Sequence, residues 1–196
     1  MDTTTHDTRQ KILDTAERLI YQNGIQAMGM DLLVRTSGVA RKSIYRYFAT
    51  KDEVAAAALN ARDIRWMQWF SSESDQAASP HERLLRMFEV LKGWFVSEGF
   101  RGCAFINTAG ETGDATDPVR VIAREHKQKL LDYILVQCGA LEVEHPQALA
   151  KQLLILVDGA ITLALVMGDL EAADSAGEAA RVLIEQAVSV NRCVPE

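Results

Sequence analysis

The sequence is divided into segments by residues that begin and end α-helices. Thr50 and Ser79 each stand three residues before a glutamate, and in this pattern the hydroxyl and the carboxylate satisfy free backbone N–H groups at a helix start. Pro118 and Pro146 follow polar residues and suit the first helical position. No segment alternates with period two for long enough to predict a strand. These signals predict an all-α fold of about nine helices.

The remaining helices are predicted from periodicity and from further start and stop signals. A stripe of period 3.6 from Ile12 to Ile20 ends at Asn23-Gly24, a typical C-terminal stop. Ser175 to Glu178 forms a third capping-box pattern. Short helices are expected near residues 30–37, 41–48 and 103–112, and the last two helices over about 147–167 and 176–191. The helix that begins after Thr50 is expected to connect two domains, 1–50 and 51–196.

Charge is distributed unevenly over these two parts. The chain has 21 Lys+Arg against 27 Asp+Glu and a formal net charge of -6. Residues 1–62 hold 9 basic and 7 acidic side chains, whereas residues 63–196 hold 12 and 20. A slightly basic N-terminal part is therefore attached to a larger acidic part.

Several classes of protein are disfavoured by composition. The polar N-terminus lacks the apolar core of a signal peptide, and the most apolar stretch, Leu153 to Met167, is interrupted by an aspartate and is shorter than a bilayer span. Three distant cysteines, Cys103, Cys138 and Cys193, favour reduced thiols over a disulfide framework. The four histidines show no spacing typical of metal ligands, so we expect no metal and no other cofactor. A cytoplasmic location is expected.

Positive charge is concentrated in one short stretch. Residues 35–51 contain five basic residues, two tyrosines and no acid. Gly38 separates two short predicted helices, and on the second of them Ile44 and Phe48 share one face while Arg41 and Tyr45 share another. An apolar face that packs and a basic face that is exposed are typical of a DNA recognition helix. The alternative is a basic face that only meets solvent.

The run GIQAMGMDLLVRTSGVARKSIYRYFATKDEVAAAAL, residues 24–59, closely resembles the N-terminal DNA-binding region of TetR-family transcriptional regulators. The matching features are the Gly38-Val39 step, the aromatic pair Tyr47-Phe48, and a lysine before an acidic helix start. Val34 and Leu32 depart from the usual pattern, which affects only packing between the first short helices. The resemblance covers roughly the first 60 residues, and extends less specifically, through length and helix pattern, to the rest.

The resemblance implies a helix-turn-helix domain in residues 1–50 and contacts to base edges and phosphates from eight residues. These are Met30, Arg41, Lys42, Ser43, Tyr45, Arg46, Tyr47 and Lys51. Asp31 lies beside Met30, but its carboxylate would repel a phosphate, so no role in DNA binding is assigned to it.

For residues 51–196 the resemblance implies a domain that binds a small-molecule effector and forms a dimer. Aromatic side chains that are either core residues or walls of an effector pocket are Trp66, Trp69, Phe70, Phe88, Trp94 and Phe105. Cys103, Asn107 and Glu111 form a polar strip with a spacing of four residues. This strip either is structural, with Asn107 capping a neighbouring helix and Glu111 paired to Arg120, Arg124 or another cation, or it contacts the ligand. Weaker polar candidates for ligand contacts are His126, Tyr133, Asp158 and Thr162.

The segments 147–167 and 176–191 carry broad apolar stripes, and the resemblance implies that they form a four-helix interface with a second chain. The predicted function is therefore a homodimeric, ligand-responsive repressor of a pseudo-palindromic DNA operator, released by a small apolar or amphipathic molecule. One alternative is an enzyme with Cys103 as nucleophile, His126 as base and Asp158 as the group that orients it. Another is a helical adaptor that binds only protein.

Overall fold

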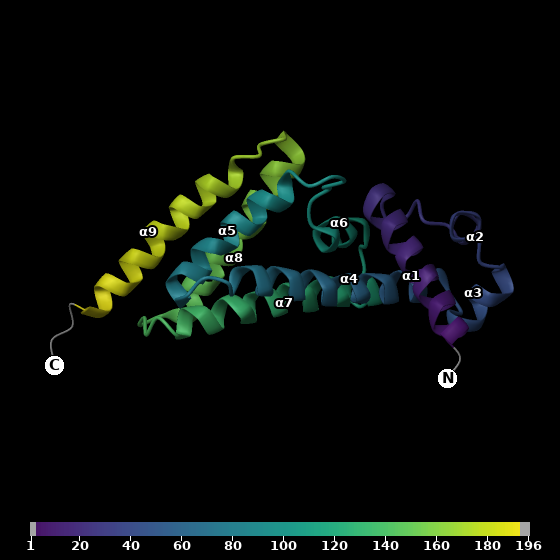
Figure 1. Cartoon of the computed structure of the whole chain (residues 1–196), viewed down its shortest axis with the longest axis horizontal. Helices are drawn as coiled ribbons and strands as arrows, with labels where there is room; N and C mark the ends of the chain where they lie inside the picture. Colours follow the sequence, from purple (N-terminus) through teal and green to yellow (C-terminus); the bar gives the residue numbers. More distant parts are fainter. Residues whose placement is uncertain (1–2, 193–196) are drawn as a thin grey trace. The chain divides into compact units, whose positions relative to one another are not determined.

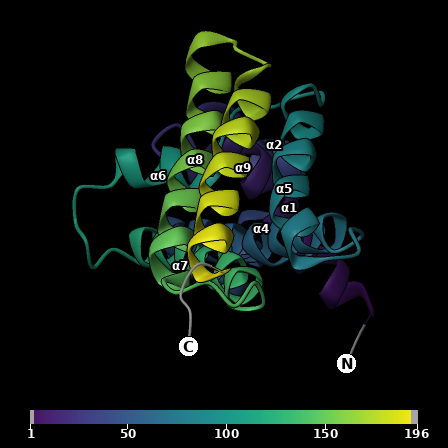
Figure 2. The same cartoon turned by 90° about the vertical axis from the view of Figure 1, so that its left-hand side faces the viewer.

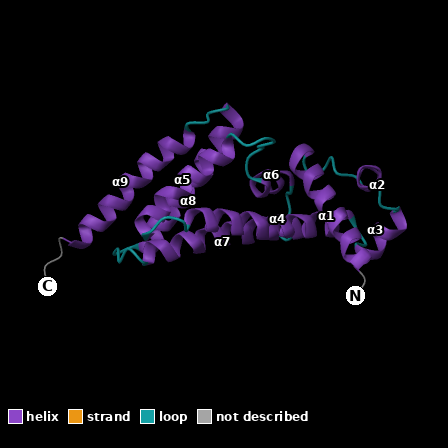
Figure 3. Ribbon diagram, viewed as in Figure 1, coloured by secondary structure: helices purple, strands orange, loops and turns teal. Residues whose placement is uncertain are grey.

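A computed structural model describes residues 3–192, which form nine α-helices and no strand (Figures 1 and 3). This confirms the all-α prediction, and Cys193 lies outside the described residues. The helices are α1 (Thr3–Asn23), α2 (Met30–Ser37), α3 (Arg41–Tyr47), α4 (Lys51–Ser74), α5 (Pro80–Phe95), α6 (Ala104–Glu111), α7 (Pro118–Gly139), α8 (Pro146–Met167) and α9 (Ala172–Arg192).

Most of the predicted helix starts are confirmed. Ser79 accepts a hydrogen bond from the backbone N–H of Glu82 and the Glu82 carboxylate accepts one in return, so α5 begins with a complete capping box. At α4 the hydroxyl of Thr50 accepts from the N–H of Glu53 at 3.1 Å, as expected. The Glu53 carboxylate, however, accepts from the N–H of Ala49 at 2.8 Å, one residue before the position of a standard box.

The predicted start of α9 at about residue 176 is wrong, because the helix begins four residues earlier, at Ala172. The side chain of Asp169 accepts a hydrogen bond from the N–H of Glu171 at 3.0 Å and supports the turn that precedes the helix. The N–H of Ser175 bonds to the carbonyl of Glu171 at 3.1 Å, so Ser175 already lies within helical hydrogen bonding.

The chain separates into two compact units. Unit 1 comprises residues up to 65 together with 103–126, and unit 2 comprises 66–102 together with 127 onward. The boundary therefore falls inside α4 and inside α7. Because the packing units do not follow the functional boundary expected between residues 50 and 51, that boundary stays a prediction.

In unit 1, α1 packs against α2 and α3 around a core that includes Ile12, Leu33 and Ile44. The Glu17 carboxylate of α1 forms ion pairs with Arg62 and Arg65 of α4, and the Arg62 pair is 2.9 Å long. The Arg62 guanidinium also lies 3.8 Å above the ring of Tyr21, and its burial lowers its pKa. These contacts attach α1 to the first half of α4.

In unit 2, α8 and α9 run side by side and α5 packs against both (Figure 2). The core contains Leu84, Phe88 and Leu91 of α5 and Leu153 and Val157 of α8, with small residues of α9 between them. This three-helix layer leaves the other faces of α8 and α9 exposed.

Within the described residues, α8 is the one helix that is long and apolar enough to cross a membrane by length and composition. The helix is longer than the apolar stretch Leu153–Met167 singled out in the sequence, because it begins at Pro146 and its 22 residues extend about 33 Å. A core helix of a soluble protein passes the same test, and α8 packs along α9.

Candidate functional site

The turn between α2 and α3 fixes how α3 is presented. Gly38 ends α2 in the left-handed conformation, φ 65°, and its N–H bonds to the carbonyl of Val34 at 3.0 Å. The next N–H, of Val39, donates to the hydroxyl of Ser37 at 3.2 Å, so two successive N–H groups of the turn bond to acceptors in α2. As predicted, Ile44 and Phe48 are buried, and they anchor α3 to the rest of unit 1.

The opposite side of α3 is exposed and basic. Arg41, Lys42, Tyr45 and Arg46 are all exposed, and the sequence pattern alone predicted this arrangement. The Arg46 guanidinium lies over the ring of Tyr47, 5.1 Å from its centroid, and donates a hydrogen bond of 3.2 Å to the Tyr47 hydroxyl. The contact holds the guanidinium and the phenol together at the C-terminal end of the exposed face.

Arg41, at the N-terminal end of α3, forms an ion pair with Asp31 in the first turn of α2. Both side chains are exposed, so the pair contributes little to folding stability. It offsets the charge of Arg41 and restricts the direction of its guanidinium. The structure thereby gives a role to Asp31, for which the sequence offered none.

Glu111, the last residue of α6, binds the backbone of the loop that follows α1. Its carboxylate oxygens accept hydrogen bonds from the N–H groups of Ile25, at 3.2 Å, and Gln26, at 3.1 Å. The neighbouring Gly24 has a φ of +87°, and a Cβ there would lie 2.7 Å from a Glu111 oxygen. Lys51 donates to the carbonyl of Ile25 at 3.4 Å, so one short loop connects α1, α4 and α6.

The pairing of Glu111 with Arg120 or Arg124, one of the sequence-based hypotheses, is not what the structure shows. Arg120 instead donates hydrogen bonds to the carbonyls of Ala109 and Thr112, at 2.8 and 3.0 Å, and so satisfies the C-terminal end of α6. Backbone N–H groups carry no recognisable sequence signal, so the sequence did not reveal the partners of Glu111.

His126 occupies a buried polar pair in unit 1. Its Nδ1 lies 2.7 Å from a carboxylate oxygen of Asp63, and both side chains are almost completely buried. The ring of Phe105 stacks on the imidazole with 3.8 Å between centroids. Asp158, which the enzyme hypothesis required as the orienting group, forms an ion pair with Lys127 at 2.6 Å. In the structure Asp63 is thus the carboxylate beside His126, and Asp158 is paired with a lysine.

The aromatic residues of unit 2 form a continuous cluster. Trp66 stacks on Phe70 with 4.8 Å between centroids, and its edge meets Trp94 at 5.7 Å. Trp69 approaches Trp94 at 6.3 Å, and Phe70 approaches Tyr133 at 6.1 Å. Phe70 is fully buried, whereas Trp69 is 36% exposed. The sequence left open whether these aromatic residues are core residues or pocket walls. In the structure Phe70 is a core residue, whereas Trp69 is exposed enough to form a pocket wall.

Two polar candidates of unit 2 have structural partners. The Tyr133 hydroxyl donates to Asp75 at 2.9 Å, and burial together with this carboxylate raises the tyrosine pKa. The Thr162 hydroxyl donates to the carbonyl of Asp158 at 2.8 Å, within α8. Phe88 is buried in the core beneath α9.

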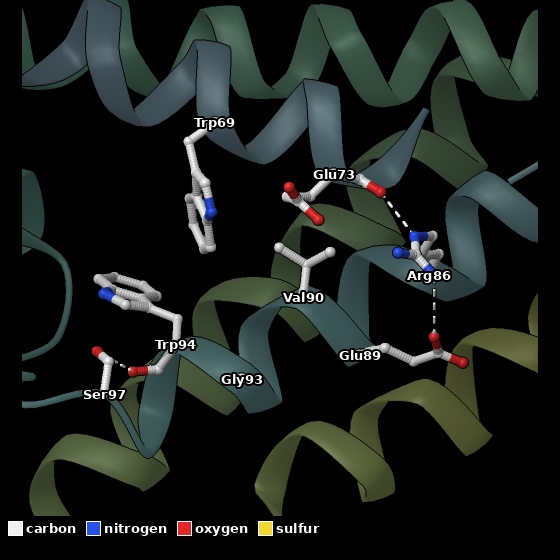
Figure 4. Close-up of a pocket in the computed structure, with 8 residues that line it drawn as sticks. All are labelled: Trp69, Glu73, Arg86, Glu89, Val90, Gly93, Trp94 and Ser97. Carbon is white, nitrogen blue, oxygen red and sulfur yellow. Dashed lines mark hydrogen bonds and ion pairs between the residues drawn. The ribbon is translucent and has the colours of Figure 1, made fainter. Parts of the chain in front are cut away.

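A pocket of about 480 Å³ lies against this cluster, between the second half of α4 and α5. Figure 4 shows the indoles of Trp69, from α4, and Trp94, from α5, next to one another on one side of it. Its lining consists of Trp69, Glu73, Arg86, Glu89, Val90, Gly93, Trp94 and Ser97. Two of the predicted ligand residues therefore line this pocket, whereas Cys103, Phe105, Asn107, Glu111 and His126 belong to unit 1.

Two protein-family models match the chain. A model described as bacterial regulatory proteins, tetR family, matches residues 12–58. A second, described as tetracyclin repressor-like, C-terminal domain, matches residues 80–180, more than half of the chain. The first match contains α2 and α3, and the second contains the pocket-lining helix α5.

Known proteins are similar over much of the chain. It is 28% identical to the HTH-type transcriptional repressor NemR of Escherichia coli over 119 residues, and this match spans 60% of each protein. It is 26% identical to the uncharacterized HTH-type transcriptional regulator YxaF of Bacillus subtilis over 83% of this chain and 87% of YxaF. The crystal structure of SCO4454, a TetR-family transcriptional regulator from Streptomyces coelicolor, superposes with a TM-score of 0.85 at 25% identity, over 93% of this chain and 97% of that one.

Proposed function

The chain belongs to the TetR family of bacterial transcriptional regulators, and from this we propose that it is a homodimeric, ligand-responsive repressor of a pseudo-palindromic operator. The resemblance recognised in residues 24–59 is confirmed by the family matches, and with it the assignment as a DNA-binding regulator. NemR is named a repressor, which supports the same direction of control here. A cytoplasmic location follows from this proposal.

The exposed basic face of α3 is the observation that carries the proposal. Arg41, Lys42 and Arg46 project from a helix whose other side is anchored by Ile44. We propose that these three residues and Ser43 contact base edges and adjacent phosphates in the major groove. The remaining predicted contacts, from Met30, Tyr45, Tyr47 and Lys51, are proposed to bind phosphates and set the orientation of α3.

We propose that α8 and α9 form the dimer interface. Ile155, Leu163 and Val166 lie along one side of α8 and are 69%, 42% and 74% exposed, and Val182 of α9 is 62% exposed. Exposed aliphatic side chains at this density are unusual on a helix that faces only water. A second copy of the same helix pair would cover them in a two-fold symmetric four-helix arrangement.

The effector is proposed to act through α4. This helix contributes residues to both compact units, with the aromatic cluster from Trp66 onward and the ion pairs of Glu17 with Arg62 and Arg65 in the part up to residue 65. A ligand that binds better to one position of α4 would shift the population of operator-competent dimers.

Operator selection with the purified full-length chain, followed by binding titrations at several salt concentrations, tests this proposal. We expect a pseudo-palindromic sequence to be enriched and to bind at least a thousandfold more tightly than scrambled duplex DNA. A complete lack of salt-dependent DNA affinity would instead support the protein-binding adaptor.

A further inference from the structure

The pocket between α4 and α5 combines aromatic walls with acidic side chains. Trp69 and Trp94 provide two indole rings in edge contact with one another, and Val90 of α5 lies beside them (Figure 4). Glu73 and Glu89 supply two carboxylates and Arg86 one guanidinium, so the charged lining has one net negative charge. A volume of about 480 Å³ is within the range of small-molecule sites.

The positive charge of Arg86 is already compensated by protein groups. Its Nε donates to the backbone carbonyl of Glu73 at 2.6 Å, and its Nη2 donates to the side chain of Gln76 at 2.8 Å. Its third nitrogen lies 3.7 Å from the Glu89 carboxylate. Every guanidinium nitrogen thus faces an oxygen, which leaves Arg86 poorly available for an anionic ligand.

Glu73, in contrast, keeps binding capacity on the pocket side. One of its carboxylate oxygens accepts a hydrogen bond of 3.0 Å from Gln76, and no hydrogen bond or ion pair reaches the other from any described residue. Glu73 is the penultimate residue of α4, where the helix dipole adds negative potential. The pocket therefore attracts positive charge from two sources.

Indole rings bind cations through their faces, and paired aromatic side chains beside a carboxylate are the usual recognition site for quaternary ammonium groups. We propose that this pocket binds an organic cation, with its ammonium group between Glu73 and the two indoles and its apolar body against Val90. The acidic composition of residues 63–196 raises the local concentration of such a ligand. If the chain is the ligand-responsive regulator proposed above, this cation is its effector.

Three probes of similar size separate charge from shape. Benzyltrimethylammonium is the cation, neopentylbenzene is its neutral carbon isostere, and phenylacetate carries the opposite charge. Each is titrated into the full-length protein, with tryptophan fluorescence and calorimetry as readouts. We expect the cation to bind about tenfold more tightly than the neutral isostere, and phenylacetate not to compete with it.

Two variants assign the binding to the pocket. Glu73→Gln should weaken binding of the cation about tenfold and leave binding of neopentylbenzene unchanged. Glu125→Gln, which removes an exposed carboxylate on α7 outside the pocket lining, is the matched control and should change neither. Circular dichroism verifies that both variants are folded. Glu89→Gln is a second variant that removes a carboxylate from the pocket lining.

Equal affinity for the cation and its isostere, tighter binding of phenylacetate, or no binding at millimolar cation would overturn the inference. Operator affinity is measured separately with and without the cation. If the cation binds at Glu73 without changing operator affinity, the site stands and its effector role fails. If no DNA is bound at all, the proposed function fails while the cation site stands.

Discussion

Glu111 and Gly24 are packed so closely that the effect of changing one should depend on the other. Glu111→Ala removes two hydrogen bonds from a carboxylate to the N–H groups of Ile25 and Gln26. Because the Gln26 bond is exposed and water can replace it, we expect a loss of about 1–2 kcal/mol in the free energy of unfolding. Gly24→Ala places a methyl group 2.7 Å from a Glu111 oxygen, at a φ of +87°. The left-handed backbone alone costs about 1 kcal/mol, and displacement of the carboxylate adds the loss above, for about 2–3 kcal/mol in total.

In the Glu111→Ala background, Gly24→Ala should cost only about 1 kcal/mol, so the two substitutions are coupled by about 1–2 kcal/mol. Urea unfolding of the four proteins, at one protein concentration because assembly affects stability, measures this coupling. Gly38→Ala is the matched control, since Gly38 also has a positive φ but its added Cβ would meet nothing closer than Lys11 at 4.0 Å. Its effect should be additive with Glu111→Ala. Additivity of Gly24→Ala and Glu111→Ala would refute the contact between α6 and this loop.

Three further predictions concern the DNA-binding face, the dimer interface and a buried thiol. Asp31→Ala should raise affinity for scrambled DNA and lower the ratio of operator to scrambled affinity, since the released Arg41 can then bind phosphates; an unchanged ratio in fluorescence anisotropy would contradict this. Leu163→Glu should give monomers or insoluble protein, because it places an unpaired charge in a desolvated interface; a wild-type chain that sediments only as a 21.7 kDa species at micromolar concentration would disprove the dimer. Burial raises the pKa of Cys138 to about 12, so folding favours the protonated thiol. That stability is complete below the unfolded pKa of about 8.5 and declines as pH rises toward 12, so Cys138→Ala should reduce the loss of stability between pH 8 and 11 in urea titrations; an unaltered slope would be inconsistent with a buried neutral thiol.

Local signals allowed the helices to be predicted, because the groups involved lie within one turn of each other. The capping box at Ser79 and the prolines at 118 and 146 mark helix starts through their own backbone chemistry. The same reasoning placed the start of α9 too late. Ser175 and Glu178 fit the capping pattern, but nothing in that pattern opposes a helix that begins earlier, and the turn at Asp169 makes the earlier start possible.

Contacts between distant residues could not be predicted from pattern. Glu111 binds backbone groups 85 and 86 residues away, and backbone N–H groups are present at nearly every position. Asp63 and His126 are 63 residues apart and become partners only when α4 and α7 pack. Glu111 and His126 were both candidate site residues in the sequence. The partner of each, however, depends on tertiary structure.

Some of the residues that line the pocket could be predicted from composition, and others could not. Trp69 and Trp94 were candidates because large aromatic side chains are rare and cluster in the sequence. Glu73, Arg86 and Glu89 were missed, since charged residues on amphipathic helices usually face solvent. Only the packing of α4 against α5 shows that these charges lie beside the indoles.

DNA recognition by α3 is tested most directly by titrating the wild type, Arg41→Ala and Lys51→Ala onto the selected operator and a scrambled duplex at several salt concentrations. Arg41→Ala should lose about 1–3 kcal/mol of binding free energy on the operator and much less on scrambled DNA, because a lost base contact affects only the correct sequence. Lys51→Ala should weaken binding to both duplexes. It should also reduce the slope of log affinity against log salt concentration, because about one fewer phosphate is neutralised. If both variants bind the operator as tightly as the wild type does, the basic face of α3 only meets solvent and the proposed mode of DNA binding is wrong.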